Sequence, residues 1–94
     1  MKVTPDTRPL TDDELIARYI ELNPRRPGRD RAHVRDAGVE VWALVAYYQD
    51  GAPGDVDEVA RVYDIPVDAV RAALAYYGRE RDLIDARLTL LRSS

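Results

Sequence analysis

Residues 55–77 read DVDEVARVYDIPVDAVRAALAYY and hold two amphipathic segments on either side of a tight turn. The first segment starts at Asp55, and a capping residue followed by further acidic residues is typical of a helix start. Apolar residues recur with helical spacing as far as Tyr63 and again from Val67 onward, and residues 64–66 separate the two runs. The pattern predicts two helices joined by a three-residue turn, which is the geometry of a helix-turn-helix unit.

The turn and the second helix of this unit bear on DNA binding. Asp64 occupies the position where such a turn needs a left-handed residue, a conformation that aspartate tolerates. Five residues of the second helix are expected to face outward: Asp68, Arg71, Ala72, Ala75 and Tyr76. One arginine among alanines and an aspartate is a poor set for reading base edges. The second helix is therefore interpreted either as a DNA-contacting helix or as a structural scaffold.

Residues 41–48 (VWALVAYY) are apolar on every side. A helix without a polar face must be covered all round, and the neighbouring helices are expected to cover only one side. We therefore expect the other side to meet a second copy of the chain, giving a homodimer, or another protein. The predicted dimer or core interface consists of Val39, Val41, Trp42, Val45 and Tyr48.

Two short alternating pieces, residues 32–35 and 39–41, flank a turn that ends at Gly38. They suggest a small β-hairpin or ribbon ahead of the core helices. Strands of this length are marginal alone and need further partners, which a second copy of the chain could supply.

A basic segment interrupts an otherwise acidic protein. The formal net charge is −3, yet residues 25–35 hold five arginines against one aspartate. The candidate partner- or DNA-binding residues are Arg25, Arg26, Arg29, Arg31 and Arg35, with Arg71 of the second helix as a secondary contact. A flexible basic loop can follow a phosphate backbone, enter a minor groove or reach into an acidic pocket of a protein. The alternative is a loop that is merely solvated.

The two ends of the chain complete the predicted organisation. Residues 1–10 are interpreted as a flexible lead, and residues 11–94 as a single helical domain. Its parts are a helix over 11–22, an arginine-rich loop and β segment over 24–41, a helix-turn-helix core over 41–77 and a C-terminal helix over 79–92. The last helix carries an apolar stripe of Leu83, Ile84, Leu88 and Leu91. This stripe is expected either to pack on the first helix or to cover a groove of a partner.

Composition excludes several function classes. The chain has 94 residues, is 46% hydrophobic and contains no cysteine, which indicates one small domain without thiolate metal sites or disulfides. Its longest apolar run is far short of the ~20 residues that span a bilayer, and no signal peptide is visible, so we expect a cytoplasmic protein. The single histidine, His33, has no neighbouring nucleophile, and no metal-ligand spacing or glycine-rich loop occurs. We therefore expect no enzymatic activity, no cofactor or metal, and no small-molecule substrate.

Residues 31–77 resemble a bacterial family, domain of unknown function family 433. The matching stretches are GVEVWALV (38–45), DEVARVY (57–63) and VDAVRAALAY (67–76); at residues 30–39 only the hairpin outline of the family is kept. The resemblance implies a mainly α, homeodomain-like helix-turn-helix domain of three to five helices. It also implies an antitoxin of a type II toxin–antitoxin pair, which neutralises a PIN-like ribonuclease and binds operator DNA as a dimer. The alternative is a stand-alone DNA-binding transcriptional regulator.

Overall fold

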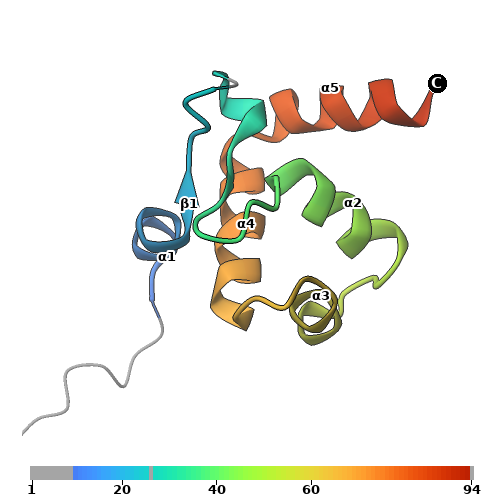
Figure 1. Cartoon of the computed structure of the whole chain (residues 1–94). Helices are drawn as coiled ribbons and strands as arrows, with labels where there is room; N and C mark the ends of the chain where they lie inside the picture. The colour runs from blue at the N-terminus through green and yellow to red at the C-terminus, as the bar shows by residue number, and fades with distance from the viewer. Residues whose placement is uncertain (1–9, 26, 94) are drawn as a thin grey trace, which may run out of the picture.

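The computed structural model describes residues 10–25 and 27–93, and within them the chain is mainly helical (Figure 1). Five α-helices follow one another: α1 (Asp12–Tyr19), α2 (Val41–Asp50), α3 (Val56–Tyr63), α4 (Val67–Arg79) and α5 (Arg81–Arg92). Three short elements lie between α1 and α2: strand β1 (Ile20–Glu21), the 3₁₀ helix η2 (Arg29–Arg31) and strand β2 (His33–Val34). The predicted fold class, mainly helical with a short antiparallel strand pair before the core helices, is confirmed. Residues 1–9 of the predicted lead lie outside the described residues.

The central element is α4, which packs against α1 on one side and against α2 and α3 on the other (Figure 1). Its fully buried residues are Ala69, Val70, Ala72 and Ala73, and Tyr76 is 8% exposed. The prediction that Ala72 and Tyr76 face outward is therefore wrong. A helix flanked on both sides keeps only a narrow exposed strip, and small alanines let the neighbouring helices approach closely.

The two helices and the short turn predicted over residues 55–77 are found where their local signals place them. Asp55 caps α3 by accepting a hydrogen bond from the Glu58 amide at 3.0 Å. Asp64 ends α3 in the left-handed conformation with a φ of 57°, and α4 begins after Pro66. α4 runs two residues further than predicted, through Gly78 to Arg79.

The first helix is shorter than its spacing predicts. The predicted start at Thr11 is confirmed, because Thr11 and Glu14 form a reciprocal capping box. The predicted end at residue 22 is wrong, since α1 stops at Tyr19 and Ile20–Glu21 form β1. Antiparallel pairing of β1 with His33–Val34 takes over the backbone hydrogen bonds that a helix would have used.

The hairpin predicted over residues 32–41 is only part of a larger arrangement. The Val34 amide donates to the Val39 carbonyl at 2.7 Å, and His33 forms an isolated bridge with Glu40. The third stretch comes from β1 of the same chain. The second copy invoked to complete these strands is therefore not needed.

The expectation that residues 41–48 leave one side uncovered is also wrong. Helix α2 packs against α3, α4, α5 and η2, and none of its large apolar side chains is among the exposed ones. The five residues predicted as a dimer or core interface belong to the core or pack against it: Val39, Val41, Trp42, Val45 and Tyr48. Homodimerisation stays a prediction, but α2 no longer supports it.

Candidate partner-binding surface

The arginine-rich segment is folded back on the domain rather than extended. Arg35 pairs with Glu21 at 3.0 Å. Its guanidinium also donates to three carbonyl oxygens at the end of α1, those of Ala17, Arg18 and Ile20. Three carbonyls and a carboxylate use most of the donors of one guanidinium. Arg35 therefore holds β2 to the end of α1, which is a structural role.

Residues 29–31 are fixed by contacts with the C-terminal half of the chain. The Tyr76 hydroxyl donates to the Arg29 carbonyl at 2.6 Å, and Arg87 of α5 pairs with Asp30 at 2.9 Å. The Arg31 guanidinium lies 3.9 Å from the Glu40 carboxylate. The interpretation of this part as a flexible loop is wrong, because its one turn of 3₁₀ helix is held by α4 and α5.

Two arginines of the segment remain available to a partner among the described residues. Arg25 is exposed and forms no ion pair with them. Arg29 is 65% exposed at its side chain, with a loose contact of 3.6 Å to Glu80. Arg26 lies outside the described residues. The charge that the sequence concentrates in residues 25–35 is thus only partly available at the surface.

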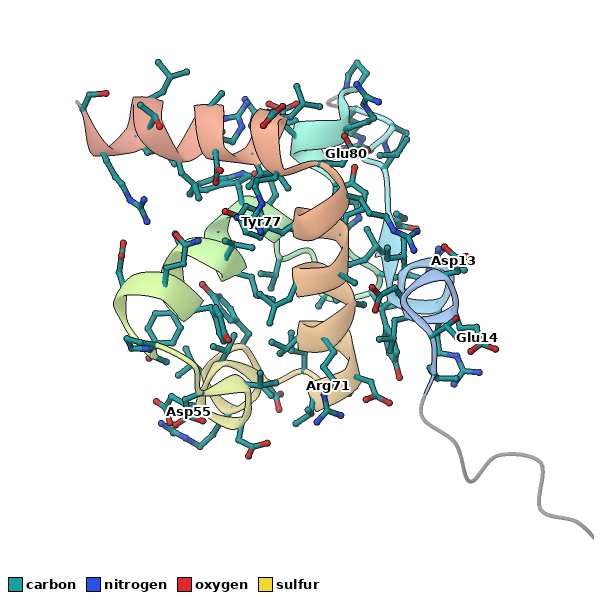
Figure 2. All side chains as sticks on the ribbon, turned by 180° about the vertical axis from the view of Figure 1, so that it is seen from behind. Asp13, Glu14, Asp55, Arg71, Tyr77 and Glu80 are labelled. Carbon is teal, nitrogen blue, oxygen red and sulfur yellow. The ribbon has the colours of Figure 1, made fainter. Side chains whose placement is uncertain are left out.

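The fold adds arginines that the sequence analysis did not select. A polar hollow of about 480 Å³ lies at the corner between α4 and α5, where Figure 2 labels its lining residue Glu80. This junction hollow is lined by Arg29, Gly78, Arg79, Glu80, Arg81, Asp82 and Leu83. Three arginines and two acidic residues thus line the hollow. No side chain caps α5, and the carboxyl end of α4 lies at the same corner, so the opposite partial charges of the two helix ends adjoin here.

The apolar stripe of α5 divides between two faces. Ile84 and Leu88 are 0% and 2% exposed, and α5 packs against α2, η2 and α4. The predictions that Ile84 and Leu88 line a partner groove and that the stripe packs on the first helix are both wrong. Leu83 and Leu91, in contrast, are 38% and 46% exposed.

The outer side of α5 is an apolar ridge. Leu90 is 73% exposed, the highest value among the large apolar residues described. Leu83, Ala86 and Leu90 follow an i, i+3, i+7 pattern and therefore share one side of the helix, with Leu91 next to it. We call these four residues the leucine ridge. Since Leu83 also lines the junction hollow, the ridge and the hollow form one continuous surface.

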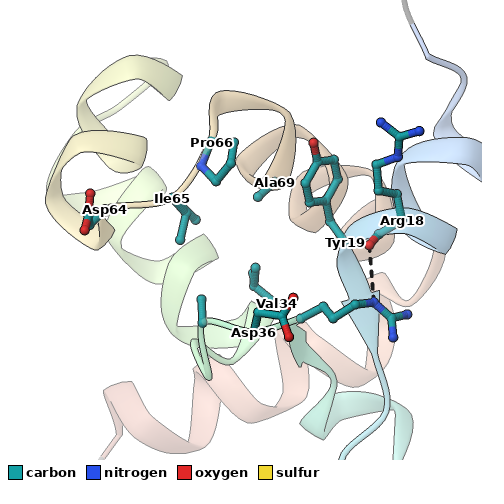
Figure 3. A pocket seen from close by; sticks show the side chains of 10 residues that line it. Arg18, Tyr19, Val34, Asp36, Asp64, Ile65, Pro66 and Ala69 are labelled. Atoms are coloured by element: carbon teal, nitrogen blue, oxygen red, sulfur yellow. Dashed lines mark hydrogen bonds between the residues drawn. The ribbon is translucent and has the colours of Figure 1, made fainter.

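A second hollow, of about 420 Å³, lies beside the α3–α4 turn (Figure 3). Val34 and Ala69 form a buried apolar floor, and Tyr19 lies at one side. Asp36 and Asp64 line it as well, and both have left-handed backbone conformations. It is a small apolar depression near the amino end of α4.

The exposed strip of α4 is poorly suited to a polyanion. Arg71 is exposed but pairs with Asp68 of the same helix at 3.3 Å. At the other end of α4, Arg79 pairs with Asp13 of α1 at 2.6 Å. Figure 2 shows Asp13 and Glu14 on α1, beside α4. Acidic groups thus accompany both Arg71 and Arg79.

Across 10–25 and 27–93, no three acidic or histidine side chains gather as a possible metal site. His33 lies 2.8 Å from Glu21, to which Arg35 is also paired. This cluster joins β1 to β2. Among the helices described, none is long and apolar enough to cross a membrane.

A family model described as a protein of unknown function, DUF433, matches residues 20–77, more than half of the chain. The chain belongs to the DUF433 family. The match begins at β1 and ends in α4, so α1 and α5 of this DUF433 protein lie outside it. Comparisons with curated proteins and with solved structures gave no significant match. The leucine ridge is therefore a feature of this chain that the family model does not cover.

Proposed function

We propose that this DUF433 chain is a non-enzymatic binding protein, the antitoxin of a type II toxin–antitoxin pair, which neutralises a PIN-like ribonuclease. One observation carries the proposal. The exposed leucines of α5 and the arginines of the junction hollow form one surface through Leu83. An apolar ridge beside guanidinium groups fits a partner with an apolar groove next to a carboxylate-rich cleft.

The chemistry of the proposed partner suits this surface. A ribonuclease that holds divalent metal ions with clustered carboxylates has an acidic active-site cleft. Guanidinium groups such as those of Arg29 and Arg81 can pair with these carboxylates and exclude metal or RNA phosphate. The leucine ridge would supply the apolar contact that gives most of the affinity.

Operator binding is the second activity that the antitoxin role implies, and a stand-alone transcriptional regulator is the alternative function. The α3–turn–α4 geometry favours DNA binding, because it has the order and turn of a helix-turn-helix unit. The burial of Ala72 and Tyr76 and the acidic groups beside α4 favour the scaffold interpretation. Protein binding is accordingly the leading proposal.

The test starts from the reading frames adjacent to the gene, one of which the proposal expects to encode a PIN-like ribonuclease, and uses that protein together with the purified chain. Cleavage of a labelled RNA should be inhibited stoichiometrically as the chain is added. A gel-shift assay with the DNA upstream of the pair measures operator binding separately. Unimpeded cleavage at a tenfold excess of the chain would refute the antitoxin proposal, and a gel shift without inhibition would favour the regulator.

A further inference from the structure

The three arginines of the junction hollow differ in what neutralises them. Arg79 pairs with Asp13 at 2.6 Å and Arg29 with Glu80 at 3.6 Å. Arg81 has no carboxylate partner within 4 Å among the described residues, although it lies in the same hollow. Its guanidinium carbon lies 4.9 Å from the centre of the Tyr77 ring instead. Arg81 is therefore the arginine of this hollow without a carboxylate partner among the described residues, whereas Arg29 is loosely paired.

An aromatic ring orients a guanidinium without cancelling its charge. The Tyr77 ring is itself fixed, because its hydroxyl donates to Asp85 of α5 at 2.6 Å. The Gln49 amide donates to the same hydroxyl at 3.5 Å. Contacts from both α2 and α5 thus hold the ring under Arg81. Because the ring already restrains the Arg81 side chain, that side chain loses less rotational freedom on binding than an unrestrained arginine would.

We propose that Arg81, held over the ring of Tyr77, binds a carboxylate group of an acidic protein partner, and that Tyr77 is its positioning residue. This inference rests on the proposed function for its biological setting. Two features of the hollow favour a protein carboxylate over a nucleic-acid phosphate. Glu80 and Asp82 keep the net charge of the hollow small, which disfavours a polyanionic backbone, and Leu83 continues the hollow into the leucine ridge.

The test titrates the full chain with a capped peptide that carries a single glutamate and follows the Arg81 Nε–Hε signal by NMR. We expect a saturable shift of this signal in the millimolar range. Arg81→Gln should weaken peptide binding roughly tenfold or more. The matched control Arg92→Gln, whose arginine pairs with Asp50 at the far end of α5, should bind like the parent. Equal affinity of Arg81→Gln and the parent would overturn the inference.

Two substitutions of Tyr77 test positioning. Tyr77→Phe keeps the ring and should retain an ordered Arg81 signal, whereas Tyr77→Leu removes the ring and should weaken peptide binding about two- to fivefold. Thermal melts identify any variant that fails to fold. If Tyr77→Leu fails to fold, the Tyr77→Phe and Arg81→Gln results decide whether Tyr77 positions Arg81. A disordered Arg81 signal in Tyr77→Phe, or unchanged binding by folded Tyr77→Leu, would contradict the positioning role.

Inorganic phosphate separates the two ligand chemistries. We expect phosphate to bind more weakly than the single-glutamate peptide, and tighter phosphate binding would overturn the assignment to a carboxylate. The titration contains no ribonuclease. Absence of peptide binding would refute the carboxylate site without refuting the antitoxin proposal. A ribonuclease that is not inhibited would refute the antitoxin proposal without refuting the carboxylate site.

Discussion

Helix α5 is expected to respond in opposite ways to alanine substitution on its two faces. Leu88 is 2% exposed and Leu90 is 73% exposed, although the two residues are separated by one position. Leu88→Ala removes a side chain that packs in the core, whereas Leu90→Ala removes one that mainly contacts solvent. Comparing the two substitutions therefore tests whether one face of α5 packs in the core while the leucine ridge contributes little to stability.

The magnitudes follow from burial. A buried leucine replaced by alanine costs about 2–5 kcal/mol, because the lost transfer energy adds to the energy of the cavity left behind. A domain of this length has a free energy of unfolding of roughly 5–14 kcal/mol. A loss of about 3 kcal/mol would lower Tm by roughly 12–24 °C. Leu90→Ala should change the free energy of unfolding by no more than about 0.5 kcal/mol.

Urea unfolding followed by tryptophan fluorescence is the assay. Trp42 is the single tryptophan of the chain, and Arg87 of α5 lies 6.0 Å from the centre of its ring. The probe thus reports on the contact between α2 and α5. Similar destabilisation by Leu88→Ala and Leu90→Ala, or a negligible effect of Leu88→Ala, would refute the placement of α5.

Three further outcomes are expected from the same measurement. Arg35→Gln should destabilise the domain by about 1–2 kcal/mol, since it removes bonds to the end of α1, and Arg25→Gln, at an exposed site, should be neutral; equal effects would contradict this. Asp64→Val should cost more than about 1 kcal/mol, because β-branched residues tolerate the left-handed φ of 57° poorly; an unchanged stability would argue against that turn. Burial raises the pKa of Tyr63 and Tyr76, so the unfolded chain releases these protons first and stability should fall as the pH rises above about 10; a stability that rises there would contradict it.

Local signals allowed much of the helical fold to be predicted. The capping residues Thr11 and Asp55 and the left-handed Asp64 act within a few residues of themselves. Their effects are therefore legible in sequence. These residues mark the start of α1 and both ends of α3, and the structure has these helix ends where the sequence predicts them.

Long-range pairing explains the errors. Ile20 continues the helical spacing of α1, yet pairing with Val34 places it in a strand. Helix α5 and η2 cover the face of α2 that was expected to be exposed. Periodicity within residues 41–48 gives no information about these contacts, so the sequence indicated an uncovered face. Tertiary contacts, rather than local preference, decide both cases.

The candidate site was predictable only in part. The arginine segment and Leu83 were identified, but the loose contact between Arg29 and Glu80 joins residues far apart in sequence. Arg79 and Arg81 gave no signal, because only the bend between α4 and α5 brings them to the same hollow as Arg29. A charged residue at a helix junction acquires its role from the angle between the helices.

The most direct test of the proposed partner-binding surface is calorimetric titration of the PIN-like ribonuclease with paired variants. The ridge variant carries Leu83→Glu and Leu90→Glu, and the control carries Leu22→Glu and Val62→Glu at residues that are 56% and 45% exposed away from α5. Both pairs add the same charge to exposed apolar sites. We predict that the ridge variant binds roughly 100-fold more weakly than the parent and that the control binds as the parent does. Parent-like affinity of the ridge variant would contradict the account.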